Sequence, residues 1–339
     1  MAKILFRTSG GRAKKTQLGL GHIFRCINLS DELHSHELHF LIEDYGEVFC
    51  LLSNRGFKNI SLLSPGLSEE LDLKHTVDYI IKNKINLLII DKYKITNRFI
   101  KKIRNIVNVV VISDLKKISY NSDLVINGFI GFENKIVKNS YGTKCLLGPK
   151  YQILNKSYKK FKNSKKKFDL LISLGGYDAN NLIEIILKKI SKLTDIKIRV
   201  ILGHATKRNP NLQKILNKSP NIAIIKSTNN FKKEISSSKF GICAGGITTY
   251  EFACMQVPFA ILCQYPHQII TAREWNKRKV GKNLGFIKNN LRKFDYFLNQ
   301  YIQNRIILNP TELVDGFGGE RIAIEIEKIL KRNSRIRKI

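Results

Sequence analysis

The segment QLGLGHIFRC, residues 17–26, determines the fold prediction because it joins two different patterns. Before it, KILFRTS (residues 3–9) is a short run typical of a buried strand, and after it residues 22–33 place apolar side chains at helical spacing. A strand, a glycine-containing loop and a helix in this order form a unit that α/β proteins use to bind phosphate groups. The segment therefore predicts an α/β domain with a ligand site at this loop.

The first half of the chain continues this alternation of strands and helices. Short apolar strands separated by amphipathic helices are typical of parallel βαβ units. We expect helices at 76–84 and 97–107, and strands at 3–9, 38–44, 86–91, 107–114 and 122–128.

A lysine- and asparagine-rich stretch at 155–167 interrupts this pattern and is predicted to be a linker, because it is polar and lacks periodicity. The alternation restarts with a strand at 168–176 and a helix at 180–193. The prediction is an N-terminal α/β domain at 1–154, a C-terminal α/β domain at 168–331 and a basic tail at 332–339. Two tandem, doubly wound, Rossmann-like domains would face each other across a cleft that binds the ligand.

Composition limits the functional classes. The 339 residues are 43% hydrophobic and 25% charged, which is globular composition, and the net charge is +32. Aromatic residues are not interleaved with the basic runs, so a solvated surface is favoured over a nucleic-acid groove, and a small anionic substrate remains compatible. Neither a signal peptide nor a run long enough to span a membrane is recognisable, and a cytoplasmic protein is expected. The six cysteines form no CxxC pair, which predicts reduced, mostly buried thiols.

His22 is the first candidate for chemistry. Gly19 and Gly21 fit a dinucleotide fingerprint, but Phe24 occupies its third glycine position, so an NAD site is not expected. What remains is a flexible loop that brings His22 to the start of a helix, where an imidazole can take a proton from water. The alternative is a capping or packed histidine. Arg25, on the same helix face, could touch a phosphate or a sugar oxygen, and Cys26 is expected to be a buried small residue.

The second candidate lies in GICAGGITTYE, residues 241–251. A strand ends at Ala244-Gly245-Gly246, and a helix follows near Thr248. Backbone N–H groups at such a helix start suit a diphosphate, and Glu251 could accept hydrogen bonds from both ribose hydroxyls. In the alternative interpretation Thr248 is the N-cap of the helix and Glu251 its capping-box partner.

Two further sites follow strands. Gly175 and Gly176 would let the backbone of the second domain approach a ligand, while Asp178 is expected to cap the next helix rather than take part in chemistry. Asp91 and Tyr93 follow a strand of the first domain and could bind a sugar. The histidines of HSHELH, at 34, 36 and 39, straddle a helix end and a strand, so a metal site there is not expected.

These motifs give the chain a resemblance over nearly its whole length to the UDP-2,4-diacetamido-2,4,6-trideoxy-β-L-altropyranose hydrolases of pseudaminic acid biosynthesis, with relatives named for spore coat polysaccharide synthesis. The family is similar in turn to the GT-B glycosyltransferases. The residues that carry the resemblance are GLGHIFRC, IIDKY, CLLGPKYQIL (145–154), LISLGGYD, GICAGGITTYEFACMQVP, the pair His267-Gln268 and DGFGGERI (315–322). Ser113-Asp114 stands where relatives usually have two aspartates, and His267-Gln268 where they have Asn-Gln.

The resemblance implies roles for individual residues. His22 would be the general base that activates water, and Tyr93 would lie near the sugar. The turn from Ala244 to Thr249 would hold the diphosphate, and Glu251 the uridine ribose. The full set of expected substrate-binding residues is Gly21, Arg25, Asp91, Tyr93, Gly175, Gly176, Ala244, Gly245, Gly246, Thr248, Thr249, Glu251 and Gln268.

The expected function is therefore metal-independent, inverting hydrolysis of a UDP-amino-deoxy sugar, without a cofactor, by a monomer without a nucleic-acid partner. One alternative is a GT-B glycosyltransferase that passes the sugar to an acceptor. A second is a non-catalytic module that binds a nucleotide-sugar or nucleic acid.

Overall fold

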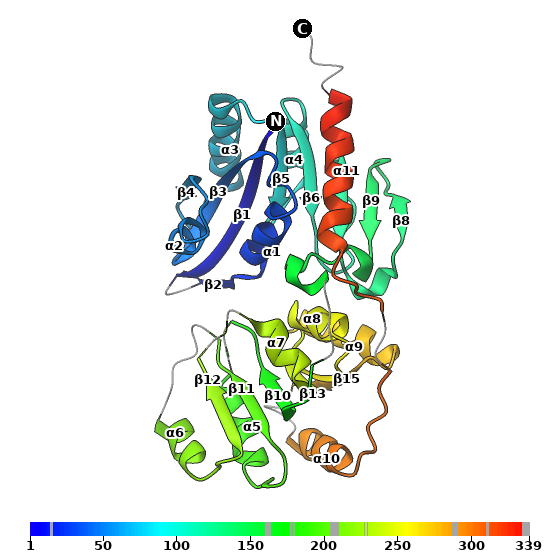
Figure 1. The fold of residues 1–339 in the computed structure, drawn as a ribbon. Helices are drawn as coiled ribbons and strands as arrows, with labels where there is room; N and C mark the ends of the chain where they lie inside the picture. Colours follow the sequence, from blue (N-terminus) through cyan, green and yellow to red (C-terminus); the bar gives the residue numbers. More distant parts are fainter. Residues whose placement is uncertain are drawn as a thin grey trace. The chain divides into compact units, whose positions relative to one another are not determined.

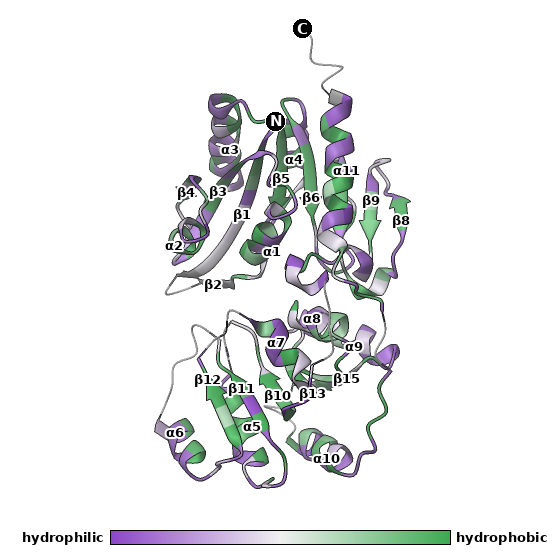
Figure 2. Cartoon of the chain, viewed as in Figure 1, coloured by the Kyte–Doolittle hydropathy of each residue, from purple (hydrophilic) through white to green (hydrophobic). Residues whose placement is uncertain are grey.

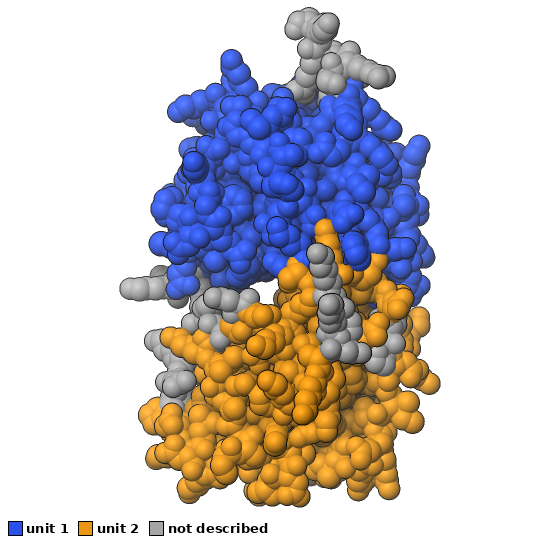
Figure 3. Space-filling model, in the orientation of Figure 1, with its two compact units in different colours: residues 1–156, 316–339 blue, residues 157–315 orange. Residues whose placement is uncertain are grey.

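The computed structural model describes residues 1–13, 16–159, 164–176, 178, 180–203, 210–226, 228, 230–286, 291–309 and 312–333 (Figure 1). The chain forms two compact units (Figure 3). Unit 1 comprises Met1–Lys156 and Gly316–Ile339, and unit 2 comprises Ser157–Asp315.

Unit 1 is built on a predominantly parallel sheet in the order β4-β3-β1-β5-β6-β7-β9-β8. In the described part of the chain only β2, beside β1, and β8, beside β9, are antiparallel to their neighbours. The strands are β1 (Lys3–Ala13), β2 (Thr16–Gly19), β3 (Glu37–Tyr45), β4 (Asn59–Leu63), β5 (Leu87–Asp91), β6 (Asn108–Ile112), β7 (Leu124–Asn127), β8 (Ile136–Lys138) and β9 (Lys144–Leu147).

Helices cover both faces of this sheet because its central strands are apolar on both sides. Ile4 and Phe6 pack with α1, α2 and α11, whereas Leu5 faces α3 and α4. The helices are α1 (Gly21–Ser30), α2 (Val48–Ser53), α3 (Glu69–Asn83), α4 (Asn97–Arg104) and α11 (Gly318–Asn333), with short 3₁₀ turns η1 (Ile130–Phe132), η2 (Pro149–Tyr151) and η3 (Lys156–Lys159).

The prediction of a flexible loop between the first strand and the first helix was wrong. Strand β1 continues to Ala13 and pairs antiparallel with β2, with Gly11 opposite Gly19, so the segment is a β-hairpin whose residues 14 and 15 lie outside the described residues. Gly11 has φ +105°, and a Cβ there would lie 2.4 Å from the carbonyl oxygen of Gly46. Only glycine allows the hairpin to pack so closely against the end of β3.

Unit 2 is a six-stranded sheet of described residues in the order β12-β11-β10-β13-β14-β15, parallel throughout. Helices α5, α6 and α10 pack on one face, and Phe252 of α8 and Trp275 of α9 contact Phe259 from the other. The elements are β10 (Phe168–Ser173), α5 (Leu182–Ile190), β11 (Ile198–Ile201), α6 (Pro210–Asn217), β12 (Ile222–Ile225), α7 (Phe231–Ser236), β13 (Ser238–Ala244), α8 (Thr248–Cys254), β14 (Phe259–Leu262), α9 (Gln268–Lys277), β15 (Gly281–Gly285) and α10 (Leu291–Ile302).

Both sheets reverse their strand order next to their first strand. In unit 1 this switch point lies between β1 and β5, and in unit 2 between β10 and β13. At a switch point the following loops diverge to opposite faces and leave a crevice at the carboxyl ends of the strands, where α/β proteins bind ligands. His22 follows β1 through the hairpin and Asp91 ends β5, while Gly175-Gly176 follow β10 and Gly245-Gly246 follow β13.

The division into units differs from the sequence-based domains at two places. Helix α11, expected in the second domain, packs Ile322, Ala323 and Ile326 into the core of unit 1. The hydropathy stripes along α11 in Figure 2 mark its amphipathic character, which by itself does not say which core it joins. The predicted linker also begins differently, because Tyr158 is buried within unit 2, and its residues 160–163 lie outside the described residues. The predicted basic tail lies outside them from residue 334 onward.

Two of the recognised motifs meet where α11 begins. A Cβ on Gly318 would lie 2.1 Å from the backbone oxygen of Gln152, so the DGFGGERI segment abuts the LLGPKYQI segment closely. Arg321 then donates to the carbonyl of Lys150 (3.0 Å), and Glu325 pairs with Lys144 (2.6 Å). These contacts fix the C-terminal helix on unit 1.

Replacing Ile326 by Ala should destabilise unit 1, because this side chain is fully buried there and its truncation leaves a cavity costing about 2–5 kcal/mol. Hydrogen exchange followed by mass spectrometry should show faster exchange in peptides from β1 and α1 than in those from β10 to β14. Ile324, half exposed on the same helix, is the matched control, and Ile324→Ala should leave both sets unchanged. Equal acceleration in β10 to β14 would contradict this assignment of α11.

Candidate functional site

The first residues of α1 bring His22 to the switch point of unit 1. Gly19, with φ +71°, turns the chain out of β2, and Gly21 is the first helical residue. Leu20 at the N-cap supplies no side-chain hydrogen bond to the helix start. An apolar N-cap cannot accept hydrogen bonds from the first N–H groups of α1, which lie next to His22 in the chain.

His22 is held by the carboxylate at the end of β5. Its Nδ1 lies 2.6 Å from Oδ1 of Asp91, a residue that is fully buried. Nη2 of Arg25 also lies 3.1 Å from this Nδ1, but its shorter hydrogen bond is to Oδ1 of Asp91 (2.6 Å). Because an ionised carboxylate can only accept a hydrogen bond, we assign the proton to Nδ1. In the neutral imidazole the lone pair is then on Nε2, which makes that atom the one able to take a proton.

Arg25 occupies a different role from the one expected. Its Nε donates to Oδ2 of Asp91 (2.7 Å) and its Nη2 to Oδ1 (2.6 Å), while Nη1 donates to Asp114 (2.5 Å). With its donors committed to two carboxylates and only 8% of its surface exposed, Arg25 is built into the protein rather than offered to a phosphate. Asp91 has no exposed surface, so it orients His22 instead of facing a sugar.

The charges of this cluster explain the proton affinity of His22. Asp91 and Asp114 are negative and Arg25 is positive, so a protonated His22 completes neutrality. Burial lowers the pKa of His22, but the Asp91 carboxylate raises it by charge and hydrogen bonding, and the net pKa is above the ordinary value. Burial likewise opposes ionisation of Asp91, yet Arg25 and His22 hold its pKa below the usual range.

Three further residues lie near this cluster in the sequence or in the fold, namely Cys26, Ser113 and Tyr93. Cys26 is fully buried, as expected, and burial followed by the nearby Asp91 charge raises its pKa well above the usual value, which makes it a poor nucleophile. Ser113, at one of the departures from the family pattern, donates its hydroxyl to the carbonyl of Lys117 (2.5 Å) and so shapes the turn that carries Asp114. Tyr93 is 68% exposed, and its role stays a prediction.

In unit 2 the glycines permit close packing of the loops at the switch point. A Cβ on Gly245 would lie 2.8 Å from Cβ of Gln268, whereas one on Gly246 would meet open space. Gly175 has φ +82°, and a Cβ on Gly203 would lie 2.3 Å from its carbonyl oxygen. Glycine at 175, 203 and 245 therefore keeps these loops together at the ends of the strands, and Gly246 is exposed beyond Ala244, the last residue of β13.

The capping-box interpretation of α8 was wrong. The N-cap is Ile247 in a helical conformation, without a side-chain cap, so Thr248 is the first helical residue. The hydroxyl of Thr249 donates to the carbonyl of Gly246 (2.8 Å) and accepts from the indole nitrogen of Trp275 (3.0 Å). Thr249 thus fixes the glycine turn from inside the protein, which leaves its side chain unavailable to a diphosphate.

Glu251 has a partner that sequence reasoning missed. The hydroxyl of Tyr158, a buried residue of η3, donates to Oε1 of Glu251 (3.0 Å). Burial raises the pKa of Glu251 to about 7, although hydrogen bonds from Tyr158 and Thr248 act to lower it. No motif marks Tyr158, because it lies in the polar segment that reads as a linker.

Glutamine side chains tie two of these loops to each other. Gln268 accepts from the backbone N–H of Gln264 (2.8 Å), whose amide donates to the carbonyl of Leu174 (2.8 Å). Beside them His267 stacks on Tyr265 with ring centroids 5.7 Å apart. Gln264 therefore ties the loop after β14 to the loop after β10, and Gln268 fixes the backbone of Gln264 from the start of α9.

The remaining sequence candidates have structural roles. Asp178 accepts from the N–H groups of Leu182 and Ile183 (2.9 and 2.8 Å), which confirms it as a helix cap. His34, His36 and His39 contact different partners, namely the Asp31 carbonyl, Glu327 and the Tyr79–Glu37 pair. Within the described residues no group of three His, Cys, Asp or Glu side chains is arranged to hold a metal ion.

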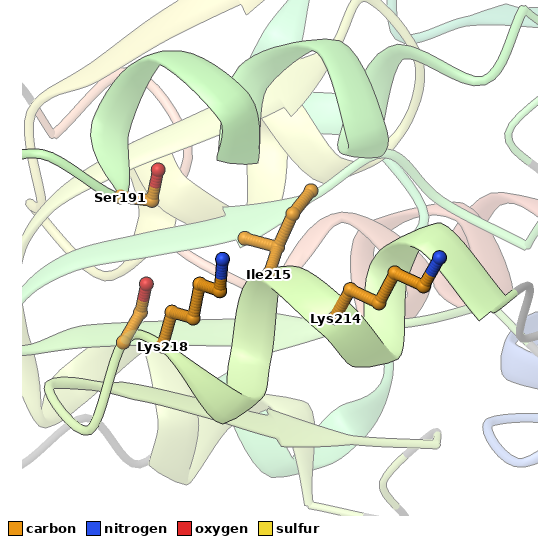
Figure 4. Close-up of a pocket in the computed structure, with 5 residues that line it drawn as sticks. Ser191, Lys214, Ile215 and Lys218 are labelled. Carbon is orange, nitrogen blue, oxygen red and sulfur yellow. The ribbon is translucent and has the colours of Figure 1, made fainter.

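A shallow pocket of about 250 Å³ lies elsewhere in unit 2, lined by Ser191, Lys214, Ile215, Lys218 and Ser219 (Figure 4). Its lysines belong to α6 and the turn after it, away from the loops at the switch point of unit 2. Among the helices that the structure describes, none combines the length and the apolar character needed to cross a membrane.

Replacing Thr249 by Val should destabilise the protein by about 1–3 kcal/mol, because the buried indole N–H of Trp275 loses its acceptor. Trp275 is the single tryptophan, so urea unfolding can be followed by its fluorescence. Thr248→Val, at a half-buried neighbour, should cost less. Equal unfolding midpoints for the two variants would mean that the Thr249 hydroxyl contributes nothing to stability.

Replacing Asp91 by Asn should lower the pKa of His22, since the main source of its upward shift is removed. In the wild type, the raised pKa gives a stabilising contribution that is fully present below the unfolded value of about 6.5 and is lost as pH rises through the folded value. NMR titration of the His22 ring, assigned with a His22→Gln variant, measures this directly. Asp114→Asn is the matched control and should lower the pKa less; a larger effect from Asp114 would refute the assignment.

No family model matches the chain. Among curated proteins, an uncharacterised Methanocaldococcus jannaschii protein is 28% identical over 281 residues, and this match covers 77% of the chain but only 56% of that protein. Spore coat polysaccharide biosynthesis protein SpsG of Bacillus subtilis is 27% identical, covering 79% of the chain and 80% of SpsG. UDP-2,4-diacetamido-2,4,6-trideoxy-beta-L-altropyranose hydrolase of Campylobacter jejuni is 27% identical, covering 82% of the chain and 97% of that enzyme.

Solved structures agree on the fold. MurG of Acinetobacter baumannii superimposes with a TM-score of 0.68 at 14% identity, over 97% of this chain and all of that one. The S. aureus MnaA–UDP co-structure gives a TM-score of 0.63 at 14% identity, over 98% of this chain and 97% of that one. The chain therefore has a GT-B-like fold and is a distant homologue of the Campylobacter UDP-sugar hydrolase and of SpsG.

Proposed function

We propose that the protein hydrolyses a UDP-activated amino-deoxy sugar at its anomeric carbon. The substrate in this proposal is UDP-2,4-diacetamido-2,4,6-trideoxy-L-altrose or a close analogue, and the free sugar would enter synthesis of a nonulosonic acid or another surface glycan. The observation that carries the proposal is the contact between His22 Nδ1 and Asp91, because it leaves a basic Nε2 at the switch point of unit 1. The name of the Campylobacter relative supports the choice of substrate.

In the proposed reaction Nε2 of His22 takes a proton from water as the water oxygen bonds to the anomeric carbon. The bond from that carbon to the UDP oxygen breaks, and UDP leaves with the electron pair. Attack opposite the leaving group inverts the anomeric configuration. Asp91 stabilises the imidazolium that forms, and a positioned base of this kind contributes about 10²–10⁴-fold to the rate.

Unit 2 would hold the nucleotide. The turn from Ala244 through Gly246 to Thr248 would donate backbone N–H groups to the diphosphate, and Glu251 would accept the ribose hydroxyls. Gly175, Gly176 and Gln268 would border this site. Because backbone donors offset the developing charge on the diphosphate, the departure of UDP needs no metal ion in this scheme.

The test compares His22→Ala with Glu251→Gln, using UDP-2,4-diacetamido-2,4,6-trideoxy-β-L-altropyranose with EDTA and no acceptor. NMR follows UDP and the first sugar anomer, and calorimetry measures UDP binding. Wild type should release both products, with the inverted anomer first. His22→Ala should lose at least 10²-fold in rate with unchanged UDP affinity, since it lacks only the base. Glu251→Gln should weaken UDP binding.

Each contrary outcome has a defined meaning. UDP release only on addition of an acceptor would replace the hydrolase by a glycosyltransferase that uses the same residues. UDP binding without turnover in wild type and His22→Ala alike, under both conditions, would indicate a non-catalytic binding module. Activity that appears only in a parallel assay without EDTA would refute the metal-independent scheme.

A further inference from the structure

We infer that Tyr158 is a positioning residue of the nucleotide site, which orients the Glu251 carboxylate for the paired hydroxyls of a ribose. This inference rests on the proposed function, since it assigns a second residue to the ribose subsite. Neither the motifs nor the comparisons single out Tyr158.

The contact between the two side chains is direct and enclosed. The Tyr158 hydroxyl lies 3.0 Å from Oε1 of Glu251, and only 4% of Tyr158 is exposed. The preceding residue, Ser157, accepts a hydrogen bond from Lys232 of α7 through its carbonyl, so the turn that carries Tyr158 is anchored within unit 2. A side chain fixed in this way restricts the rotamers of Glu251 before any ligand arrives, which reduces the ordering cost of binding.

The direction of the hydrogen bond follows from proton affinities. Burial and the Glu251 charge raise the pKa of Tyr158 well above its usual value, so its hydroxyl keeps its proton and donates. A carboxylate offers about four lone-pair sites, and among the described residues Tyr158 and Thr248 occupy two of them. The remaining sites match the two hydroxyl donors that a ribose presents at its 2′ and 3′ positions.

Tyr158 also affects the charge of Glu251. In the part of the chain that the structure describes, the groups that face this carboxylate are the Tyr158 hydroxyl from η3, the Thr248 hydroxyl from α8 itself, and the thiols of Cys243 on β13 and Cys254 on α8. Burial raises the pKa of Glu251 to about 7, and the Tyr158 hydrogen bond opposes that rise. Removing the hydroxyl should therefore raise the pKa further and leave more Glu251 protonated at neutral pH, with fewer acceptors for ribose.

The experiment is calorimetric titration of wild type and Tyr158→Phe with UDP and with 2′-deoxy-UDP between pH 5.5 and 8.5. Both ligands share the same phosphate titration, so the ratio of their affinities isolates the ribose contact. Wild type should prefer UDP by about ten-fold at pH 8, and the preference should fall as the pH drops through about 7. In Tyr158→Phe the preference should be smaller at pH 7, and its rise should move to higher pH.

Matched variants separate orientation from general damage. Tyr301→Phe also removes one partly buried tyrosine hydroxyl in unit 2, which donates to the carbonyl of Asp169, and it should behave as wild type. Glu251→Gln should abolish the ribose preference, and adding Tyr158→Phe to it should cause no further loss. If Tyr158→Phe regains part of its preference for UDP over 2′-deoxy-UDP at pH 8.5, the site is still folded, and the lost preference at pH 7 comes from a raised pKa of Glu251.

The failures of the two proposals are distinguishable. If wild type discriminates between the ligands and Tyr158→Phe keeps the same preference and pH dependence, the role of Tyr158 is refuted while the nucleotide site stands. If wild type binds neither ligand, the proposed function fails and the inference falls with it. If wild type binds both ligands equally, the ribose role of Glu251 is refuted, and that of Tyr158 with it.

Discussion

A buried carboxylate at the end of β5 organises unit 1. Asp91 is fully enclosed, and an isolated charge there would be too costly to maintain, so the fold must supply partners. Arg25 provides two donors and His22 a third, both from the first turns of α1. Helix α1 is thereby fixed in rotation relative to the sheet, and the imidazole is fixed in one tautomer.

The hydrogen bonds that neutralise Asp91 also set the proton affinity of His22. Asp114 joins Arg25 from the loop after β6 and adds the negative charge that a protonated His22 would balance. The charges of Asp91 and Asp114 favour the protonated form of the His22 imidazole, and a general base needs such stabilisation when it takes a proton. Arg25, which sequence reasoning assigned to a ligand, contributes by holding the carboxylates in place.

Among the described residues, the switch point of unit 2 is held together by close backbone packing rather than by a buried charge cluster. There the loops must approach closely, and glycines at 203 and 245 permit contacts that any Cβ would prevent. Thr249 connects the glycine turn to Trp275, and Tyr158 holds Glu251. The exposed backbone of the turn is thus supported by side chains that point inward, and the residues that support a site differ from those that would touch a ligand.

The sequence by itself determined the two α/β units and the strands that carry the motifs, because apolar periodicity and glycine turns are local properties of the chain. It also placed His22 at the start of the first helix. It did not determine that β1 continues to Ala13 and pairs with β2, that α11 joins unit 1, or that Arg25 and Tyr158 contact carboxylates. An amphipathic helix can cover either core, and a donor such as Arg25 can bind a phosphate or an aspartate equally well. Only the tertiary structure decides, because it brings Asp91 to Arg25 across 66 residues of sequence and Tyr158 to Glu251 across 93.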